Sequence, residues 1–468
     1  MMKKRLTAVL TAVLLLMPAG VVLAGDLDPY NLPASMPANV RQTVTDGIEK
    51  DRQLKLMSDP MTWDDPNMLA STISKTAADP AKETTAGTDE ELEDASAASN
   101  ADDTSVAAPN TGDPFSFNCK GALLIDSDTG AVLYEKNADN KLPVASVTKV
   151  MTLLLTFEAL DAQKFALDDM VTVSKDAAAM GGSQALLDAN GKYKASDLIK
   201  SIIVASANDS SVAMAEFLYG SESLFVERMN ERAGELGMSN THFVNCTGLP
   251  AEGQFTSVRD VSIMSRQLIR HPMFFQYSKV WMFDMPHSNG RITQLSNTNK
   301  LTRFYDGCDG IKTGSTDEAG YCLTATAKRG DSRFIAVIAG SATSAERNAS
   351  ISKMLDYAFA TYKNVTIYDE GAVIQPNVTV WGGKLDAVNA VSTEKISVLV
   401  KKGEENKVEK VVDIDQPLQA PVERGTQIGT VKVLVGGQPV AEYPIIADRT
   451  VEEAGFFTNF VKILDTFK

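Results

Sequence analysis

Metal-binding and disulfide-forming residues are scarce in this chain. Its 468 residues include only four cysteines and three histidines, and no two cysteines form a Cys-x-x-Cys pair. Ligands so few and scattered argue against a zinc site and against a disulfide framework, although one or two unassigned disulfides remain open. The histidines fall in no Ser-His-Asp arrangement, and the Gly-x-Ser-x-Gly elbow is missing, so a triad hydrolase is a weak interpretation.

A basic surface for nucleic acid is also missing, because the formal net charge is −15. The acidic residues gather near the start, where residues 26–113 hold 18 acidic and 6 basic side chains. From Thr76 onward this stretch has almost no large apolar residue, so burial cannot offset the entropy lost on ordering. We expect residues 25–114 to be a mostly disordered acidic spacer, with a short helix over 38–58 as the alternative.

Apolar runs long enough to cross a membrane are absent. The first 24 residues instead have the three regions of a secretory signal peptide: Lys3-Lys4-Arg5, the apolar stretch Leu6–Leu16, and the small-residue site Val22-Leu23-Ala24. The apolar core is shorter than the roughly 20 residues that a membrane span needs, which disfavours an uncleaved anchor. No cysteine follows the cleavage site, which disfavours a lipoprotein. We therefore expect an exported protein.

Patterns of ordered structure begin at Phe115. Short apolar runs bounded by turn residues predict strands at 121–126, 131–134, 309–314, 320–327 and 333–340. Helical periodicity predicts helices at 146–160, 196–204, 208–219, 222–236, 258–270 and 344–362. Strand pairs on both sides of a helical middle favour an α/β (α+β) sandwich over residues 115–362, closed by a late antiparallel hairpin.

The pattern changes after Tyr362. Short strands separated by Gly, Pro and Asp turns predict a small all-β domain over 367–447, with strands at 378–381, 396–400, 407–412, 427–435 and 440–446. Residues 450–468 are then predicted to form a C-terminal amphipathic helix whose face is rich in Phe and Ile. We expect it to attach the protein to a membrane surface. Docking on the β domain, or fraying, is the alternative.

Three short motifs in a fixed order carry the strongest functional signal. Ser146-Val-Thr-Lys149 is followed 60 residues later by Ser206-Ala-Asn208, and 106 residues after that by Lys312-Thr-Gly314. Ser-x-x-Lys alone is weak, because it recurs at Ser350 and Ser392, which we interpret as solvated helix pairs. The ordered trio singles out Ser146 and indicates a serine acyl-transferase whose base is a lysine.

Helix geometry explains why this residue spacing suits that chemistry. Residues i and i+3 share a helix face, so Lys149 reaches the Ser146 hydroxyl. Free lysine titrates near about 10.4 and must be neutral to act as a base. Burial, the positive end of the helix, and a second cation such as Lys312 would each lower the pKa of Lys149. The Ser146 N–H, at the helix start, would donate to a developing oxyanion.

The other two motifs have structural as well as catalytic interpretations. Ser206-Ala-Asn208 opens a helix, so it caps that helix and also presents Ser206 and Asn208 to a cleft. Gly314 would allow a substrate backbone to pack against a strand edge, or would simply precede a hairpin turn.

Around these motifs the chain resembles the serine-type D-Ala-D-Ala carboxypeptidases, which are low-molecular-weight penicillin-binding proteins of the S11 peptidase family. The resemblance covers residues 115–450 approximately and departs from the family in the acidic stretch before Phe115. Further matching segments are Leu142–Thr152, Gly181–Ser183, Asn245–Pro250, Asn297–Asn299, Asp309–Gly314 and Ala420–Val422. The resemblance implies a serine β-lactamase/transpeptidase-like fold, an accessory β domain, and no metal or organic cofactor.

The resemblance also implies an activity. Ser146 is acylated by a peptidoglycan stem pentapeptide and releases its terminal D-Ala at the outer face of the cytoplasmic membrane. Lys149 is the general base, Ser206 relays a proton, and Asn208 holds the peptide amide. β-Lactam antibiotics such as penicillin are expected to acylate Ser146 as mimics of D-Ala-D-Ala.

Recognition of the substrate's terminal carboxylate is implied for the third motif. Lys312, Thr313 and the neighbouring Gly314 would meet the carboxylate end of the peptide. The backbone N–H groups of Ser146 and Ser315 would form the oxyanion hole. Arg347 is a further candidate contact, or else a charge on a helix surface.

Two other classes of protein remain open. A class A β-lactamase shares the trio, but it needs a Glu-x-x-Leu-Asn segment that is not convincing between Ser206 and Lys312, and it lacks a later β domain. A catalytically idle envelope-binding module is the non-enzyme alternative, which the complete set of motif residues disfavours. The preferred stem peptide, and the balance between trimming and crosslink cleavage, also stay open.

Overall fold

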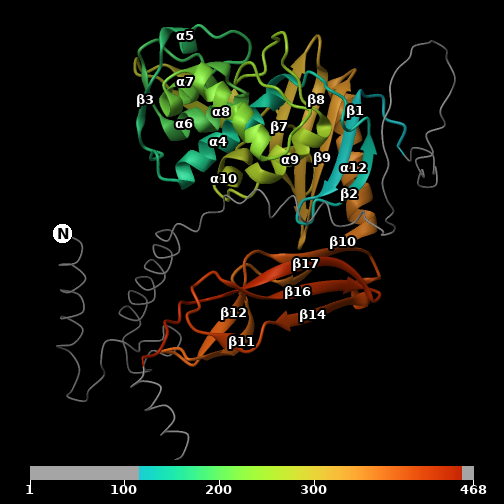
Figure 1. The fold of residues 1–468 in the computed structure, drawn as a ribbon. Coiled ribbons are helices and arrows are strands. Elements are labelled where there is room, and N and C mark those ends of the chain that lie inside the picture. The colour runs from blue at the N-terminus through green and yellow to red at the C-terminus, as the bar shows by residue number, and fades with distance from the viewer. Residues whose placement is uncertain (1–114, 456–468) are drawn as a thin grey trace, which may run out of the picture. The chain divides into compact units, whose positions relative to one another are not determined.

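The computed structural model describes residues 115–455 (Figure 1). The predicted signal peptide, the acidic segment and residues 456–468 lie outside this range, so the structure does not bear on them.

A five-stranded antiparallel sheet is the centre of the first half of the described chain. Its strand order is β2-β1-β9-β8-β7. The strands are β1 (Gly121–Asp126), β2 (Val132–Lys136), β7 (Cys308–Thr316), β8 (Gly320–Arg329) and β9 (Ser332–Ser341). β1 pairs with β9, with Leu124 opposite Ala336, so the first two strands and the last three join into one sheet. The predicted strands are therefore all present, although their bounds differ by a few residues.

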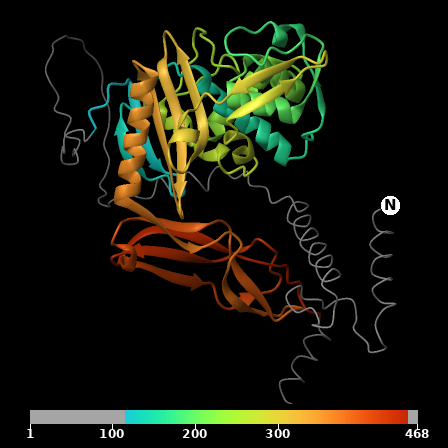
Figure 2. The same ribbon diagram turned by 180° about the vertical axis from the view of Figure 1, so that it is seen from behind.

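Apolar side chains on both faces of this sheet are buried. On one face, Leu124 and Ala336 pack with Ile351 and Leu355 of α12 (Ser344–Thr361). On the other face, Leu123 and the helical region form the main core. Figures 1 and 2 show α12 on one side of the sheet and α9 (Val258–Leu268) on the other. This layering confirms the mixed α/β fold.

The helical region has six further α-helices and one 3₁₀ helix among the described residues. They are η1 (Ala145–Thr148), α4 (Lys149–Asp161), α5 (Lys175–Ala178), α6 (Ala195–Ala205), α7 (Asn208–Tyr219), α8 (Glu222–Glu235) and α10 (Phe274–Ser278). A short α11 (Leu301–Phe304) precedes β7. Two small hairpins, β3 (Met170–Thr172) with β4 (Lys192–Lys194) and β5 (Met282–Pro286) with β6 (Ile292–Ser296), complete this region.

The helix predicted over 146–160 differs from the structure at its start. The α-helix begins at Lys149, and Ser146 lies in the 3₁₀ turn η1 that precedes it. In a 3₁₀ turn, side chains three residues apart eclipse each other. The turn thus brings Ser146 and Lys149 together more directly than an α-helical start.

The second half of the described chain is all-β, as predicted, but it begins at residue 362 rather than 367. Its strands are β10 (Tyr362–Tyr368), β11 (Val373–Trp381), β12 (Ala387–Ser392), β13 (Ile396–Lys401), β14 (Val408–Ile414), β15 (Leu418–Gln419), β16 (Gln427–Val435) and β17 (Gln438–Ala447). A 3₁₀ turn, η2 (Glu405–Lys407), precedes β14. Buried aliphatic side chains, among them Val378, Ile428 and Ile445, form a core of their own.

The prediction of a helix starting at residue 450 is wrong for the part that the structure describes. Val451 pairs with Val422 and Glu453 with Gly383 in isolated β-bridges, so the chain is extended there. Val451 is fully buried in the core of the β domain, so this segment packs as part of that domain. Residues 456–468 lie outside the described range. Among residues 115–455, no helix has both the length and the hydropathy that a membrane crossing requires.

Candidate active site

The 3₁₀ turn that carries Ser146 is held between two glycines. A Cβ added to Gly314 would lie 2.5 Å from the Val144 carbonyl oxygen and 2.9 Å from the Ser146 nitrogen. A Cβ added to Gly248 would lie 2.0 Å from the Ala145 carbonyl oxygen. Gly314 is thus required by the approach of the enzyme's own nucleophile turn, whereas the sequence interpretation assigned this space to substrate backbone.

Lys149 is completely buried and is surrounded by three oxygen atoms. Its Nζ lies 3.0 Å from Ser146 Oγ, 2.6 Å from Asn208 Oδ1 and 2.5 Å from the carbonyl oxygen of Thr247. The two latter atoms can only accept hydrogen bonds. A neutral amine therefore donates both its hydrogens to them and directs its lone pair toward the Ser146 hydroxyl. This is the arrangement that a general base needs.

Burial also favours the neutral form of Lys149. Loss of solvation is the main cause and lowers its pKa from the ordinary 10.5 to about 7, against the opposing charge of the Asp209 carboxylate. Burial, followed by the charges of Lys149 and Arg347, lowers the pKa of Lys312 well below its ordinary value. The two lysines thus lie close enough for each to disfavour the charged form of the other.

Ser206 is held in a conformation that serines rarely adopt. It ends α6 with φ of 63°, in the left-handed region, where a non-glycine residue is strained. Its side chain is buried, and among the described residues its Oγ has no hydrogen-bond partner. A buried hydroxyl without a partner is costly. Strain and an unused donor thus occur together at Ser206.

Asn208, two residues further on, begins α7 and is also buried. Its Nδ2 donates to the carbonyl oxygen of Gly181 at 2.7 Å, and its Oδ1 accepts from Lys149. The structure therefore brings the first and second motifs into direct contact.

The third motif lies on β7, beside the nucleophile turn. Lys312 and Thr313 are buried, and Lys312 Nζ donates to the Thr313 carbonyl oxygen at 3.0 Å. Thr313 Oγ1 donates to Thr298 Oγ1 at 2.8 Å. Ser315 follows Gly314 and is exposed. This end of β7 thus places a buried lysine and the hydroxyls of Thr313 and Thr298 beside the nucleophile turn.

Arg347 is not a charge on a helix surface. It lies in the first turn of α12, is only 6% exposed, and donates to the Cys322 carbonyl oxygen and to Asn348 Oδ1. Burial lowers its pKa. Because its charge acts on Lys312, Arg347 belongs to the same cationic end of the site.

The repeated Ser-x-x-Lys motifs have other roles. Ser350 and Lys353 do form a helix pair on α12, with Lys353 over the Phe115 ring. Ser392 does not, because it ends strand β12 with its Oγ bonded to the Asp369 carbonyl oxygen, while Lys395 pairs with Asp128. Neither lysine has the burial and the serine contact that distinguish Lys149.

Sequence reasoning missed two parts of the site. The Thr247 carbonyl oxygen, which takes one hydrogen of Lys149, is a backbone atom and has no residue signature, although its segment Asn245–Pro250 matched the family pattern. Thr298, the partner of Thr313, lies between Asn297 and Asn299, whose side-chain amides hydrogen-bond to the surrounding backbone.

Cys246, Cys308 and Cys322 are buried thiols outside any disulfide.

Comparison with known proteins agrees with this geometry. A family described as D-alanyl-D-alanine carboxypeptidase, peptidase family S11, matches residues 104–343. The C-terminal domain of penicillin-binding protein 5 matches residues 362–453.

Relatives of known name span most of both chains. D-alanyl-D-alanine carboxypeptidase DacF of Bacillus subtilis is 43% identical over 340 residues, covering 72% of this chain and 87% of the relative. DacA of Escherichia coli is 33% identical over 380 residues, covering 79% and 92%. The solved structure of penicillin-binding protein 5 from Haemophilus influenzae is 30% identical, with a TM-score of 0.61, and covers 72% of this chain and 98% of that one.

Proposed function

This chain belongs to the S11 family of D-alanyl-D-alanine carboxypeptidases, and we propose that its site removes the terminal D-Ala from peptidoglycan stem pentapeptides through an acyl-enzyme on Ser146. One observation carries the assignment of the nucleophile. Lys149 is buried, has a pKa of about 7, and lies 3.0 Å from Ser146 Oγ with its two other contacts made to acceptors.

Acylation begins with the transfer of the Ser146 proton to Lys149. The Ser146 oxygen attacks the carbonyl carbon of the penultimate D-Ala, and the N–H groups of Ser146 and Ser315 stabilise the oxyanion. The proton then passes from Lys149 to the nitrogen of the departing D-Ala, with the unpaired Ser206 hydroxyl as the relay. Cleavage of the C–N bond releases D-Ala and leaves an ester on Ser146, which water hydrolyses with Lys149 again as base.

The cationic end of the site accounts for the requirement of a free C-terminus. Lys312, Thr313 and Arg347 supply two cations and a hydroxyl for the terminal carboxylate of the peptide. A carboxylate there returns Lys312 to its charged form, so binding compensates for the burial of the lysine. Asn208 is placed to hold the peptide amide. Penicillins carry a carboxylate and a reactive amide at comparable positions, and acylate the same serine.

Product analysis on a purified muropeptide with labelled terminal D-Ala tests this proposal. The wild-type protein should release free D-Ala, and Ser146→Ala should release none. Ser350→Ala is the matched control, because Ser350 heads the same Ser-x-x-Lys pattern on the surface of α12 and should keep full activity. Release of D-Ala by Ser146→Ala would refute the nucleophile, and rapid turnover of penicillin would indicate a β-lactamase.

The location of the protein follows from its substrate and its ends. Relatives with this activity act on the cell wall, and the first 24 residues have the pattern of a signal peptide, so we infer an exported enzyme at the outer face of the cytoplasmic membrane. Residues 456–468 retain the apolar periodicity of an amphipathic helix, which supports attachment to the membrane surface.

A further inference from the structure

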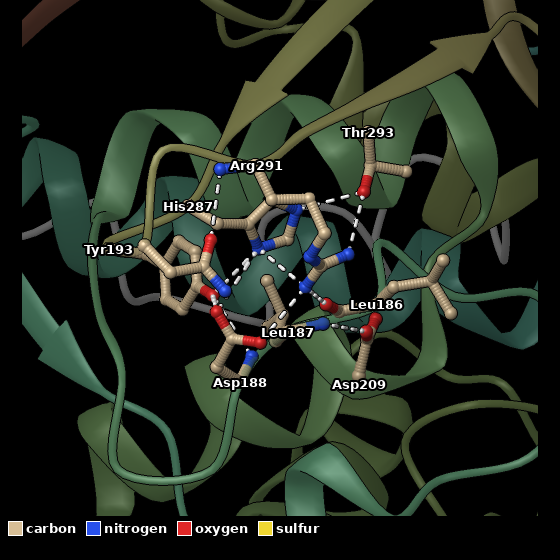
Figure 3. A network of polar contacts seen from close by, with 9 residues as sticks. Leu186, Leu187, Asp188, Tyr193, Asp209, His287, Arg291 and Thr293 are labelled. Atoms are coloured by element: carbon tan, nitrogen blue, oxygen red, sulfur yellow. Dashed lines mark hydrogen bonds and ion pairs between the residues drawn. The ribbon is translucent and has the colours of Figure 1, made fainter.

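A partly buried polar cluster lies outside the residues that contact substrate in the proposed reaction. It consists of His287, Arg291, Tyr193 and Asp188, which we call the His287 clasp (Figure 3). His287 and Arg291 come from the turn between β5 and β6. Asp188 comes from the chain leading into β4, and Tyr193 lies in β4. The His287 side chain is completely buried.

The contacts of His287 favour one tautomer. Arg291 Nη2 lies 3.1 Å from His287 Nδ1 and can only donate, although its two hydrogens also face the Leu186 carbonyl oxygen and Asp188 Oδ1 at shorter distances. Nδ1 also lies 2.8 Å from the Tyr193 hydroxyl, which can donate to it. With Nδ1 as the acceptor, the proton is on Nε2, which lies 2.8 Å from Thr293 Oγ1. We therefore interpret His287 as a neutral imidazole.

The clasp holds one side of an irregular loop, residues 181–188. Arg291 Nη2 donates to the Leu186 carbonyl oxygen at 2.6 Å and to Asp188 Oδ1 at 2.9 Å. The Tyr193 hydroxyl accepts from the Asp188 N–H at 2.9 Å. Leu186 has a φ of 61°, a strained value for a residue with a branched side chain, so its conformation depends on being held.

The other side of the same loop holds Asn208. The Gly181 carbonyl oxygen accepts from Asn208 Nδ2, and the Ser183 carbonyl oxygen accepts from the Asn208 N–H, both at 2.7 Å. Asp209 accepts from the N–H groups of Ala185 and Leu187, each at 3.0 Å. Figure 3 shows the contact to Leu187. The Gly181 carbonyl oxygen can only accept, so the Nδ2 group of Asn208 must face it. The loop thereby orients the Oδ1 atom of Asn208 toward Lys149.

We propose that the His287 clasp positions the catalytic base. The clasp holds the 181–188 loop in place, and the loop fixes the orientation of the Asn208 amide. Asn208 then accepts one hydrogen of Lys149, so that the lone pair of the Lys149 amine faces Ser146. This role rests on the proposed function of Lys149. If the loop shifts, Asn208 can rotate, and a rotated amide presents its NH₂ group to Lys149.

Protonation of His287 would open the clasp. Nδ1 would become a donor facing Arg291, and two cations would lie side by side, one of them on the completely buried side chain of His287. Asp188, 3.7 Å away, and Asp209 oppose this effect, and the Tyr193 hydroxyl faces the same nitrogen. Burial first and Arg291 second still lower the pKa of His287 below its ordinary 6.5. The clasp is therefore closed at neutral pH and opens at acid pH.

The pH dependence of acylation by a fluorescent penicillin tests the proposal in the full-length protein. Protonation of Lys149 gives the wild type an acid limb of slope about 1 in the logarithm of the rate, and protonation of His287 should steepen it toward about 2 at the acid end of the profile. His287→Gln keeps an acceptor for Arg291 and a donor for Thr293 but does not titrate. Its rate at pH 8 should stay within about threefold of wild type, and its acid limb should keep a slope of about 1.

Two comparison variants sharpen the result. His271→Gln removes another histidine, which faces Asp161 and has no contact with the clasp, and it should reproduce the wild-type profile. His287→Phe removes the acceptor, so acylation at pH 8 should fall about tenfold or more, because small misplacements at a catalytic site are costly. The proposal is overturned if the acid limb of His287→Gln steepens as that of the wild type does, or if His271→Gln loses the wild-type steepening.

Hydrogen exchange separates this proposal from the proposed function, because it needs no turnover. In His287→Phe the amides of Ala185, Leu187 and Asn208 should exchange at least about tenfold faster than in wild type, while those of α9 should not change. His287→Gln should restore wild-type exchange. If the protein fails to react with penicillin but the exchange behaves as described, the assignment of Lys149 as base is wrong, while the role of the clasp in holding the 181–188 loop and Asn208 is kept. If exchange at these amides does not change in His287→Phe, the clasp does not hold the loop and the proposal is refuted.

Discussion

At the scale of single residues, the site depends on charges that the fold keeps out of water. Lys149 and Lys312 are among the largest fully buried side chains of the described chain, and both lose the solvation that an ammonium group needs. A buried amine is costly to stability but is available as a base at neutral pH. The same burial therefore creates the chemistry and opposes folding.

Replacing Lys149 by methionine should separate these two effects. Acylation should be abolished, while the free energy of unfolding at pH 7 should rise by about 1–3 kcal/mol, because an apolar side chain of similar volume carries no desolvation cost. The folded-state pKa of about 7 lies below the ordinary 10.5, so the wild-type enzyme loses stability as pH falls from 10.5 to 7 and no further below that. The advantage of Lys149→Met should follow the same range. Denaturant titrations at pH 7 and pH 10 measure it, and a less stable variant at pH 7 would contradict this account.

Replacing Gly314 by alanine should displace the nucleophile turn. The added methyl group meets backbone atoms of Val144 and Ser146, which cannot move aside as a flexible side chain could. We expect acylation to fall about 100-fold or more and stability to fall by about 1–3 kcal/mol. Gly234→Ala is the matched control, because nothing lies within 4 Å of the added Cβ on helix α8. The control should keep its activity and gain up to about 1 kcal/mol. Rapid acylation of Gly314→Ala would show that the turn has room.

At the scale of secondary structure, the junctions between elements carry the site. Ser146 lies in the 3₁₀ turn before α4, Ser206 between α6 and α7, and Lys312 on the edge strand β7. Helix and strand interiors supply buried apolar faces that fix these junctions in place. The junctions themselves adopt the conformations, including the φ of 63° at Ser206, that regular elements do not provide.

Two substitutions at Ser206 distinguish its backbone from its hydroxyl. Glycine tolerates the left-handed conformation, so Ser206→Gly should be more stable than Ser206→Ala by about 0.5–2 kcal/mol. Both variants lack the relay hydroxyl and should lose peptidase activity to a similar degree, about 100-fold or more. Thermal denaturation and D-Ala release measure the two effects. A Ser206→Gly variant with wild-type D-Ala release would exclude the relay role.

The sequence predicted the regular elements well and the irregular ones poorly, for physical reasons. Helix α7 was predicted with its observed bounds. Helix α9 was predicted to within two residues, because its buried positions, among them Val261, Met264 and Leu268, repeat along the chain. The β5–β6 hairpin was missed, since each of its strands buries only one side chain, Met285 or Leu295. The 181–188 loop and the Thr247 carbonyl were missed as structural parts because their contacts are made by backbone atoms, which any residue carries.

At the scale of the whole molecule, the described chain combines a mixed α/β part with an all-β part, each with its own core. The β part ends in an extended segment at Val451 and Glu453 that pairs with earlier strands. The proposed membrane-binding residues begin only after this pairing ends. The structure therefore indicates where the C-terminal segment can be removed without loss of the β core.

Truncation after Gly455 should release the protein from membranes and leave its activity intact. It preserves Val451, which is fully buried and bonded to Val422, whereas truncation before residue 450 should also destabilise the β part. Sedimentation with vesicles measures attachment, and acylation by penicillin measures the site. If the protein truncated after Gly455 still sediments with vesicles, another surface holds it on the membrane.

The packing of the nucleophile turn between Gly248 and Gly314 has a consequence for antibiotic resistance. Both glycines contact the backbone that carries Ser146, and this backbone serves peptide and penicillin alike. A mutation beneath the turn would therefore impair the natural reaction as much as the inhibition. Selection for resistance in this protein should leave these two positions unchanged and act instead on exposed side chains near the site, such as that of Ser315.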